Sequence, residues 1–416
     1  MLYNLKLETE LESKQKNIDS KTYFLIKVLF VMKKSILLIT LSALSTALFF
    51  TSCSNDIAID SEVQPTKVVV PPTGEFLVSP SGYRNPSSGL IIVYDKAGNV
   101  MKQVDVGSTT MNFRKWVFAD GTVRYSFLKY DQSMYHMPYV GYNAGEIVIL
   151  NQDFQEINKI LLLPYGTRTA ADNNALDGHD FILLSDTHYI VMAYFEKAVN
   201  NISADAVPNC RVVAPIIQEV ENGKVIWEWD GTNEPELYTT SVENNDYQNG
   251  ILPQDYAHLN SIFIDPKDNN VVLSFRNLNQ VVKIDRKTSK ILWRLGGKNS
   301  DFAMTTEQKF LRQHDAHFEE DGKTMILFDN GDAKERPFTR IVEFTLDEKN
   351  KTITKYQSMY LPDRSFTQYM GSVIKTDSSY FIGCGGDPRV IEVNLATGQK
   401  IFEKKLALPS YRAYRY

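Results

Sequence analysis

Three of the six histidines stand at equivalent positions in a repeated pattern. His179 opens the segment HDFILLS, His258 opens HLNSIFI and His314 opens HDAHFEE. Each comes directly before an apolar run that is typical of a β-strand. If these runs are the innermost strands of a radial array, their equivalent ends meet at one end of its axis. We therefore expect the three imidazole rings to face one another across a central pocket.

Two further polar residues stand at strand ends close to His258. Asn260 follows it by two positions, and Arg276 ends the next apolar run. Taken singly, these two are a strand-end cap and a surface arginine. Together with three histidines they make a pocket rich in hydrogen-bond donors, which suits an oxyanion such as a sulfate or phosphate ester. The sequence indicates no acidic side chain fixed beside this pocket.

The chemistry that such a pocket favours is group transfer. A transferred sulfuryl or phosphoryl group spreads negative charge over its oxygens, so positioning and electrostatic stabilisation dominate its catalysis. Histidine supplies a nucleophile or an acid–base group at neutral pH. Three histidines can instead hold a metal. Arg276 would repel that cation and no carboxylate stands as a clear ligand, so we expect no metal.

The remaining polar candidates have weaker signals. His188 and His317 lie inside or just after strands, which favours structural roles. Asp329 and Asn330 precede Gly331 in the turn FDNGD, where they would support the site at most. A glycine-rich phosphate loop with Lys-Ser or Lys-Thr is absent, as are Gly-x-Ser-x-Gly and His-Glu-x-x-His, so we expect no nucleotide donor and no other cofactor.

The elements that must position these residues are short strands. Residues 258–297 contain four of them, NSIFID, VVLSF, QVVKID and KILWRL, separated by Asn-, Asp- and Pro-rich turns. Four strands in about forty residues is the size of one β-propeller blade. The outer hairpin of this unit recurs, with copies that start at Leu90, Glu146, Pro215, Gln280, Arg340 and Arg389.

Six copies predict an all-β chain folded as a six-bladed β-propeller over residues 74–416. Inner strands are expected within 116–128, 179–194, 258–275, 314–328 and 370–384. The segment 76–106 supplies only part of a blade, and the tail ALPSYRAYRY would complete it and close the ring. The alternative is an irregular β-sandwich. One short helix is a candidate, at 305–312.

The N-terminal part is a targeting segment and is kept out of the fold. Residues 1–31 resemble an overcalled start, and residues 32–53 resemble a lipoprotein signal that ends at a lipidated Cys53, with a plain transmembrane anchor as the alternative. Residues 54–73 are expected to form a tether. These features predict a bacterial cell-envelope lipoprotein that faces the periplasm or the surface of the outer membrane.

The composition limits the classes of partner that the protein is expected to bind. The chain of 416 residues has a net charge of −5 and 12% aromatic residues. A basic cluster with an aromatic platform is missing from the sequence, so nucleic acid is not expected as a partner. After Cys53 the only cysteines are Cys210 and Cys384, which are far apart and favoured as free thiols over a disulfide.

At this point the chain resembles a known family, the bacterial arylsulfate sulfotransferases. The similarity rests on YAHLNSIFIDPKDNNVVLSFRNLNQVVKIDRKTSKILWRLGG, on RQHDAHF, and on FDNG followed by RIVEFTLDE, and it is strongest over residues 170–360. The resemblance implies a six-bladed propeller that moves a sulfuryl group from a phenolic sulfate ester to a phenolic acceptor. It implies a ping-pong mechanism through a sulfohistidine, without a nucleotide sulfate donor.

The resemblance also implies roles for the site residues. His314 would be the nucleophile, and His258, Asn260 and Arg276 would bind the sulfuryl oxygens. His179 would assist in proton handling or oxygen binding. A homodimer is possible by the same resemblance, although the N-terminal β-sandwich of well-studied members has no counterpart here. Two other readings stay open: a non-catalytic, lipid-anchored propeller that binds a sulfated or acidic ligand, and a metal-dependent hydrolase.

Overall fold

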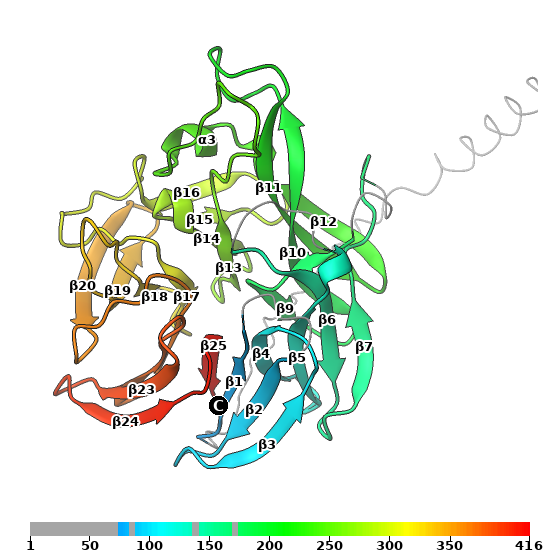
Figure 1. Ribbon diagram of the computed structural model, residues 1–416. Helices are drawn as coiled ribbons and strands as arrows, with labels where there is room; N and C mark the ends of the chain where they lie inside the picture. The colour runs from blue at the N-terminus through cyan, green and yellow to red at the C-terminus, as the bar shows by residue number, and fades with distance from the viewer. Residues whose placement is uncertain (1–73, 83–87, 135–140, 169–173) are drawn as a thin grey trace, which may run out of the picture. The chain divides into compact units, whose positions relative to one another are not determined.

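The computed structural model describes residues 74–82, 88–134, 141–168 and 174–416, all within the compact unit of residues 64–416. Within these ranges the strands form six antiparallel sheets, arranged as blades around an axis (Figure 1). The prediction of an all-β, six-bladed propeller is confirmed, and the β-sandwich alternative is wrong.

The six blades are numbered in chain order, and their strands are given from the axis outwards. Blade 1 contains β25 (Ser410–Arg415), β1 (Phe76–Pro80), β2 (Leu90–Tyr94) and β3 (Val100–Asp105). Blade 2 contains β4 (Thr110–Val117), β5 (Val123–Tyr130), β6 (Ala144–Leu150) and β7 (Glu156–Ile160), and β8 (Leu176–Asp177) pairs with β6. Blade 3 contains β9 (Phe181–Leu183), β10 (His188–Val199), β11 (Cys210–Glu221) and β12 (Lys224–Asp230).

The second half of the ring is more regular. Blade 4 contains β13 (Leu259–Ile264), β14 (Val271–Phe275), β15 (Gln280–Ile284) and β16 (Ile291–Gly296). Blade 5 contains β17 (His314–Phe318), β18 (Thr324–Asp329), β19 (Arg340–Asp347) and β20 (Thr352–Tyr360). Blade 6 contains β21 (Ser372–Lys375), β22 (Ser379–Gly383), β23 (Arg389–Asn394) and β24 (Lys400–Lys405). The described helical turns are η2 (Gln132–Met134), η4 (Gly231–Asn233), α3 (Glu236–Thr240) and η5 (Arg276–Leu278).

The C-terminal strand closes the ring, as the sequence predicts. β25 lies beside β1 near the centre of the propeller (Figure 1) and pairs with it in antiparallel register, with Leu77 opposite Tyr414. The innermost strand of blade 1 therefore comes from the last residues of the chain, and the other three come from its start. Without β25, β1 would have no partner strand on the side that faces the axis.

Packing between the blades explains the apolar runs. Successive residues of a strand point to opposite faces, and both faces of a blade are covered by its neighbours. In β1, Phe76 and Val78 pack against blade 6, whereas Leu77 packs against blade 2. One buried apolar cluster fills each of the six junctions between blades among the described residues. Runs such as LIIVY are consequently apolar throughout instead of alternating.

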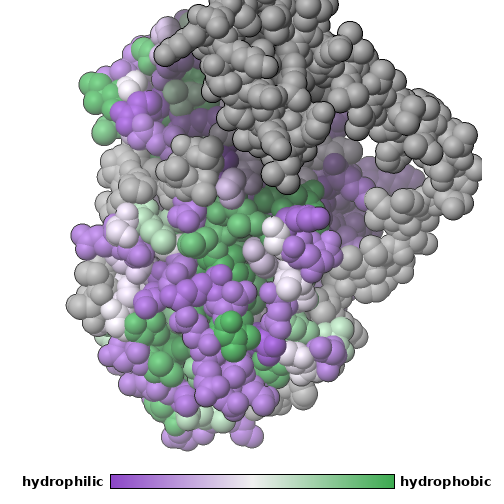
Figure 2. All heavy atoms as spheres, turned by 90° about the vertical axis from the view of Figure 1, so that its right-hand side faces the viewer, coloured by the Kyte–Doolittle hydropathy of each residue, from purple (hydrophilic) through white to green (hydrophobic). Residues whose placement is uncertain are grey.

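Outward-facing positions of the outer strands are polar or isolated apolar residues. Figure 2 shows one face of the molecule, on which polar side chains predominate and apolar ones gather in small groups. Val100 and Met101 of β3 and Ile226 of β12 are exposed in this way. Single exposed apolar residues are ordinary on a soluble surface.

Two local predictions are wrong, and others fall on residues that the structure does not describe. The inner strand expected to start at residue 116 begins at Thr110, because the run TMNF also joins β4. Residues 305–312 form a turn and not a helix, and the short helix α3 lies at Glu236–Thr240 instead. The signal at 32–53, Cys53, the tether at 54–73 and His136 lie outside the described residues. Across the described ranges, no helix combines the length and apolar character that a bilayer span requires.

Candidate active site

One cavity of about 820 Å³ lies at the end of the axis, and four of the five predicted site residues line it. His179, His258, Arg276 and His314 come from blades 3, 4 and 5, and the structure brings their side chains together. The imidazole rings of His179 and His258 meet edge to face, with centroids 5.0 Å apart. The expected convergence of the repeat-equivalent histidines is therefore observed.

Asn260 is the exception among the predicted residues. It is completely buried and is not one of the cavity-lining residues. Its side-chain amide donates a 2.7 Å hydrogen bond to the carbonyl of Gln313, the residue before His314. In this geometry Asn260 braces the start of β17, and its assignment to substrate binding stays a prediction.

The hydrogen-bond partners of its two ring nitrogens hold His314 in one tautomer. The backbone N–H of Met370 donates to Nε2 over 3.3 Å, so Nε2 carries the lone pair. Nδ1 therefore carries the proton, which it donates to Oδ1 of Asn330 at 2.8 Å. The ring is 2% exposed. Of the two ring nitrogens, Nε2 therefore holds the lone pair, and a nucleophilic attack by it would replace the 3.3 Å hydrogen bond from Met370.

The electrostatics of the cavity keep His314 neutral. Burial lowers its pKa well below 6.5, the bond to Asn330 opposes this shift, and the charge of Arg276 adds to it. A neutral imidazole with a defined tautomer is the form that acts as a nucleophile.

The turn after β18 places Asn330 against His314. Gly331 has φ +84°, and an added Cβ would lie 2.4 Å from the carbonyl oxygen of Arg336, so only glycine fits there without rearrangement. The preceding Asp329 accepts a hydrogen bond from the backbone N–H of Leu311 at 2.9 Å. The FDNG turn therefore fixes both Asn330 and the loop that leads to His314.

Carboxylates orient the other two histidines, and the prediction that acidic partners were missing is wrong. Nδ1 of His179 bonds to Asp177, and Nδ1 of His258 lies 3.1 Å from Oδ2 of Asp255. In each case Nε2 is left free of that carboxylate. Burial lowers the pKa of His258, and Asp255 works against this shift by favouring the imidazolium.

Arg276, on blade 4, lines the same cavity as the three histidines. It follows β14 directly, and its guanidinium donates to Asn277 Oδ1 at 2.9 Å and lies 3.7 Å from Glu243 Oε1. Burial and the neighbouring Arg312 lower the pKa of Arg276. At 3.7 Å the contact with Glu243 is too long for a hydrogen bond, so the guanidinium retains donors for an anionic ligand.

Apolar and aromatic side chains form part of the cavity wall, beside polar residues such as Thr110, Asn143 and Gln254. Met111, Tyr369, Met370 and Tyr411 all line it. The Tyr411 ring lies 5.4 Å from the His179 ring and 6.3 Å from the His314 ring, centroid to centroid. A wall of this composition beside a polar end suits an aromatic ring that carries a charged group.

Backbone distortion is concentrated around the cavity. His258 (φ +51°), Asp315 (φ +53°) and Met370 (φ +65°) are non-glycine residues in the left-handed region. Register shifts interrupt β13 between Leu259 and Ser261 and β17 between His314 and His317. Strained residues and β-bulges cluster at functional sites, where they re-aim side chains.

The other polar candidates have structural partners. Nε2 of His188 bonds to Glu219 at 2.6 Å, and Nδ1 of His317 bonds to the backbone carbonyl of Asp315 at 2.8 Å. Cys210 and Cys384 are free and buried, as the sequence favours. These residues are not among those that line the cavity.

A carboxylate cluster elsewhere resembles a metal site but already contains a cation. Within the described residues, Asp265, Asp268 and Glu348 have the spacing of a possible metal site. The ammonium of Lys283 lies between them, 2.5, 2.8 and 2.7 Å from their oxygens respectively. We call these four residues the buried lysine cluster, in which the ammonium occupies the place between the carboxylates that a metal ion would need.

The sequence left several site residues unidentified. Asp177 and Asp255 precede their histidines by two and three positions, in LDGHD and QDYAH. A carboxylate two or three positions before each histidine was the signal that could have found them. Tyr411 and Met370 had no comparable signal, because their place in the site depends on ring closure and on a loop conformation.

Comparisons with known proteins identify the family of the chain. The family described as arylsulfotransferase (ASST) matches residues 128–405. Two curated relatives, both called arylsulfate sulfotransferase AssT, are 30% identical. The one from Escherichia coli O6:H1 aligns over 198 residues, covering 37% of this chain and 32% of the relative. The one from Lelliottia amnigena aligns over 187 residues, covering 36% and 31%. The chain thus spans about a third of the length of these relatives.

Solved structures are similar only at a low level. A protein of unknown function from Bacteroides caccae is 14% identical, with a TM-score of 0.42 over 82% of this chain and 97% of that chain. The Swd1 β-propeller domain of Myceliophteria thermophila is 8% identical, with a TM-score of 0.41 over 80% and 87%. Structural similarity at this level adds nothing to the family assignment.

Proposed function

We propose that this chain, which belongs to the arylsulfotransferase family, transfers a sulfuryl group from a phenolic sulfate ester to a phenolic acceptor. The observation that carries the proposal is the state of His314. It is a buried, neutral imidazole with a fixed tautomer, its lone pair lies on Nε2, where it accepts a long hydrogen bond from Met370, and a guanidinium lines the same cavity. A site that only bound anions would gain more from a charged histidine than from a neutral one.

In the first half-reaction, Nε2 of His314 attacks the sulfur of the donor. A nitrogen–sulfur bond forms and the sulfur–oxygen bond to the aryl group breaks, so the phenolate departs with the electron pair. His179 enters this step as an imidazolium whose Nδ1–H is held by Asp177, and it gives its Nε2 proton to that oxygen. The enzyme is left with a sulfuryl group on His314.

In the second half-reaction, the acceptor phenol takes the place of the first product. Its proton passes to the histidine that gave one up, and its oxygen attacks the same sulfur. The nitrogen–sulfur bond breaks and His314 regains its lone pair. Donor and acceptor therefore use one aryl subsite in turn, which is the ping-pong order.

Charge stabilisation falls to Arg276 and His258. Negative charge grows on the sulfuryl oxygens and on the departing phenolate as the reaction proceeds, and prearranged donors in a buried cavity stabilise it best. Arg276 offers unspent N–H groups, and His258 is oriented by Asp255. Asn260 contributes by holding the carbonyl of Gln313. The transfer needs no nucleotide sulfate.

The proposals for the cellular location and the assembly of the protein rest on its sequence. We propose a lipoprotein of the bacterial cell envelope, anchored through Cys53, with phenolic sulfates and phenols as its substrates. Homodimer formation is proposed on the family resemblance alone. Labelling with a radioactive fatty acid tests the anchor, and the Cys53→Ser chain must lose the label.

The activity is tested with a chromogenic aryl sulfate and an excess of phenol. The wild type should release the chromophore and form phenyl sulfate, His314→Ala should release none, and acid-labile sulfate should be trapped on His314 when the acceptor is omitted. His188→Gln is the matched control, because His188 bonds to Glu219 and does not line the cavity. Binding of the aryl sulfate to the wild type without any release would instead favour a non-catalytic binding protein.

A further inference from the structure

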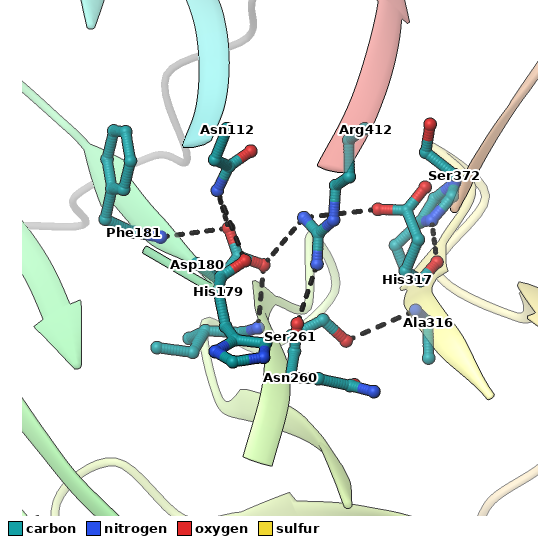
Figure 3. Close-up of polar contacts among 12 residues, drawn as sticks. Asn112, His179, Asp180, Phe181, Asn260, Ser261, Ala316, His317, Ser372 and Arg412 are labelled. Atoms are coloured by element: carbon teal, nitrogen blue, oxygen red, sulfur yellow. Dashed lines mark hydrogen bonds and ion pairs between the residues drawn. The ribbon is translucent and has the colours of Figure 1, made fainter. Parts of the chain in front are cut away.

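Arg412 of β25 sits at the centre of a buried polar network next to the cavity (Figure 3). Its Nη1 lies 3.0 Å from Oδ2 of Asp180 and 3.4 Å from Oδ1 of Asp315. Its Nη2 donates to the backbone carbonyl of Asn260 at 2.8 Å. The three partners belong to blades 3, 4 and 5, so one guanidinium from the chain terminus joins three blades.

Each of these partners is a site residue or its neighbour in sequence. Asp180 follows His179, and Asp315 follows His314. The hydroxyl of Tyr411, the residue before Arg412, also donates to the Asn260 carbonyl, at 3.1 Å. The contacts therefore fix the backbone at the points where the catalytic side chains leave it.

The same carboxylates bind backbone groups across the blade junctions. Oδ2 of Asp180 accepts from the N–H of Ile262 at 3.0 Å, which ties blade 3 to blade 4. Oδ2 of Asp315 accepts from the N–H of Val373 at 2.9 Å, which ties blade 5 to blade 6. A shift of Arg412 would therefore be transmitted to four inner strands.

Arg412 is the cation that both carboxylates share, and Arg114 adds a second cation 3.1 Å from Oδ1 of Asp180. Arg412 and Asp180 have side chains that are each 2% exposed, and Asp315 is 9% exposed. Burial opposes the charged form of Arg412, but Asp180 and Asp315 outweigh it and hold the pKa of the guanidinium well above its usual value. Only the planar fork of arginine reaches two carboxylates and a carbonyl at once, whereas an ammonium is a single point of charge.

We propose that Arg412 is a positioning residue for sulfuryl transfer, through which closure of the ring by β25 sets the relative positions of His179, Asn260 and His314. The inference rests on the proposed function for its kinetic readout, but not for its structural one. It makes the last strand of the chain part of the catalytic apparatus as well as the closure of the fold.

The test compares Arg412→Lys with the wild type in the full chain. Lysine keeps the charge but cannot make all three contacts, so the histidines should lose their relative alignment. We expect kcat with an aryl sulfate to fall about 10- to 100-fold, as misplacement by about 1 Å does, with KM changed less than about twofold since the lining side chains remain. Arg415→Lys is the matched control. It lies on the same strand and pairs with Glu392 of blade 6, away from the cavity.

A second readout does not depend on turnover. In protein labelled with ¹³C at histidine Cε1, Arg412→Lys should shift or broaden the ring signals of the three cavity histidines and leave that of His188 unchanged. If the wild type transfers no sulfuryl group but these signals move, the positioning role stands and the proposed reaction fails. Wild-type kcat together with unmoved signals would overturn the inference, as would equal losses in Arg412→Lys and Arg415→Lys.

If Arg412→Lys does not fold, a milder variant tests the positioning role of Arg412. Tyr414→Phe removes the hydroxyl that accepts from Nη1 of Arg412 at 2.8 Å and leaves every charge in place. It should lower kcat about threefold or more, as expected for one lost hydrogen bond of about 1 kcal/mol. An unchanged kcat in this variant would also overturn the inference.

Discussion

Replacing Asn330 by alanine isolates the step in which His314 is made nucleophilic. The side-chain oxygen of Asn330 accepts the Nδ1 proton of His314 at 2.8 Å, and its amide donates to the carbonyls of Thr367 and Met370 at 2.8 and 2.9 Å. Alanine removes the acceptor that selects the reactive tautomer and leaves two buried carbonyls without this donor.

The size of the effect of Asn330→Ala depends on the hydrogen-bond acceptor that remains for His314. A buried donor that loses its partner costs about 1–3 kcal/mol. Nδ1 of His314 keeps a second acceptor, the carbonyl of Arg312 at 3.1 Å, so the lower part of that range applies. A barrier raised by about 1.4 kcal/mol slows a step about tenfold. We therefore expect sulfation of His314 to slow about tenfold and the free energy of unfolding to fall by about 2 kcal/mol.

Replacing Asn330 by aspartate tests the sign of the electrostatics. Burial lowers the pKa of His314 well below 6.5, so at neutral pH the imidazole is neutral and ready to attack. A carboxylate at this position favours the imidazolium and raises the pKa. The acid limb of the pH–rate profile should therefore move up towards neutral pH in Asn330→Asp.

The assay is a rapid-mixing experiment with a chromogenic aryl sulfate and no acceptor. The rate of the first chromophore burst reports the sulfation of His314 directly. Asn394→Ala is the matched control, because Asn394 accepts hydrogen bonds in a turn of blade 6 far along the chain. The reasoning is refuted by a wild-type burst rate in Asn330→Ala, by an equal loss in Asn394→Ala, or by an acid limb that stays in place or moves down in Asn330→Asp.

Three further outcomes are expected. Lys283→Met leaves the carboxylates of the buried lysine cluster uncompensated, so urea unfolding should show a loss of about 3 kcal/mol or more, whereas kcat per folded molecule stays at the wild-type value. Asp255→Asn removes the charge that opposes the effect of burial on His258, so its pKa should fall further below 6.5 in an NMR titration, and a rise would contradict the assignment. Burial raises the pKa of the Cys384 thiol to about 12 and also raises that of Cys210. At pH 8 both should resist iodoacetamide until the protein is unfolded, and rapid alkylation of the folded protein would show that these side chains are accessible.

Much of the fold was predictable because propeller blades are built from local signals. Each outer hairpin carries its own strands and its own turn, and both faces of a blade are buried, so the runs are apolar and easily found. The copies at Gln280 and Arg389 match β15–β16 and β23–β24 residue for residue at their starts. The start of β4 was missed because the run TMNFRKW contains polar residues that a bulge between Met111 and Arg114 accommodates.

The site was predictable only where the repeat carried it. His179, His258 and His314 are found by sequence because they stand at the same place in three blades. Asp177 ends the two-residue strand β8 and Asp255 lies in a loop, where hydrophobic periodicity gives no information, so the acidic character of the pocket was underestimated. Asn330 was found, but only as a turn residue, because nothing local indicates that its blade-5 turn faces the first strand of the same blade.

Arg412 marks the limit of such local reasoning. In sequence it is one of two arginines in the tail SYRAYRY, each preceded by a tyrosine, so Arg412 and Arg415 look alike. They differ because residues three apart on a strand point to opposite faces: Arg412 reaches Asp180 and Asp315 at the axis, whereas Arg415 reaches Glu392 of blade 6. The face is set by the register of β25 on β1, a contact between the two ends of the chain. A role that depends on that register becomes visible only when the ring is closed, which is also the condition under which it operates.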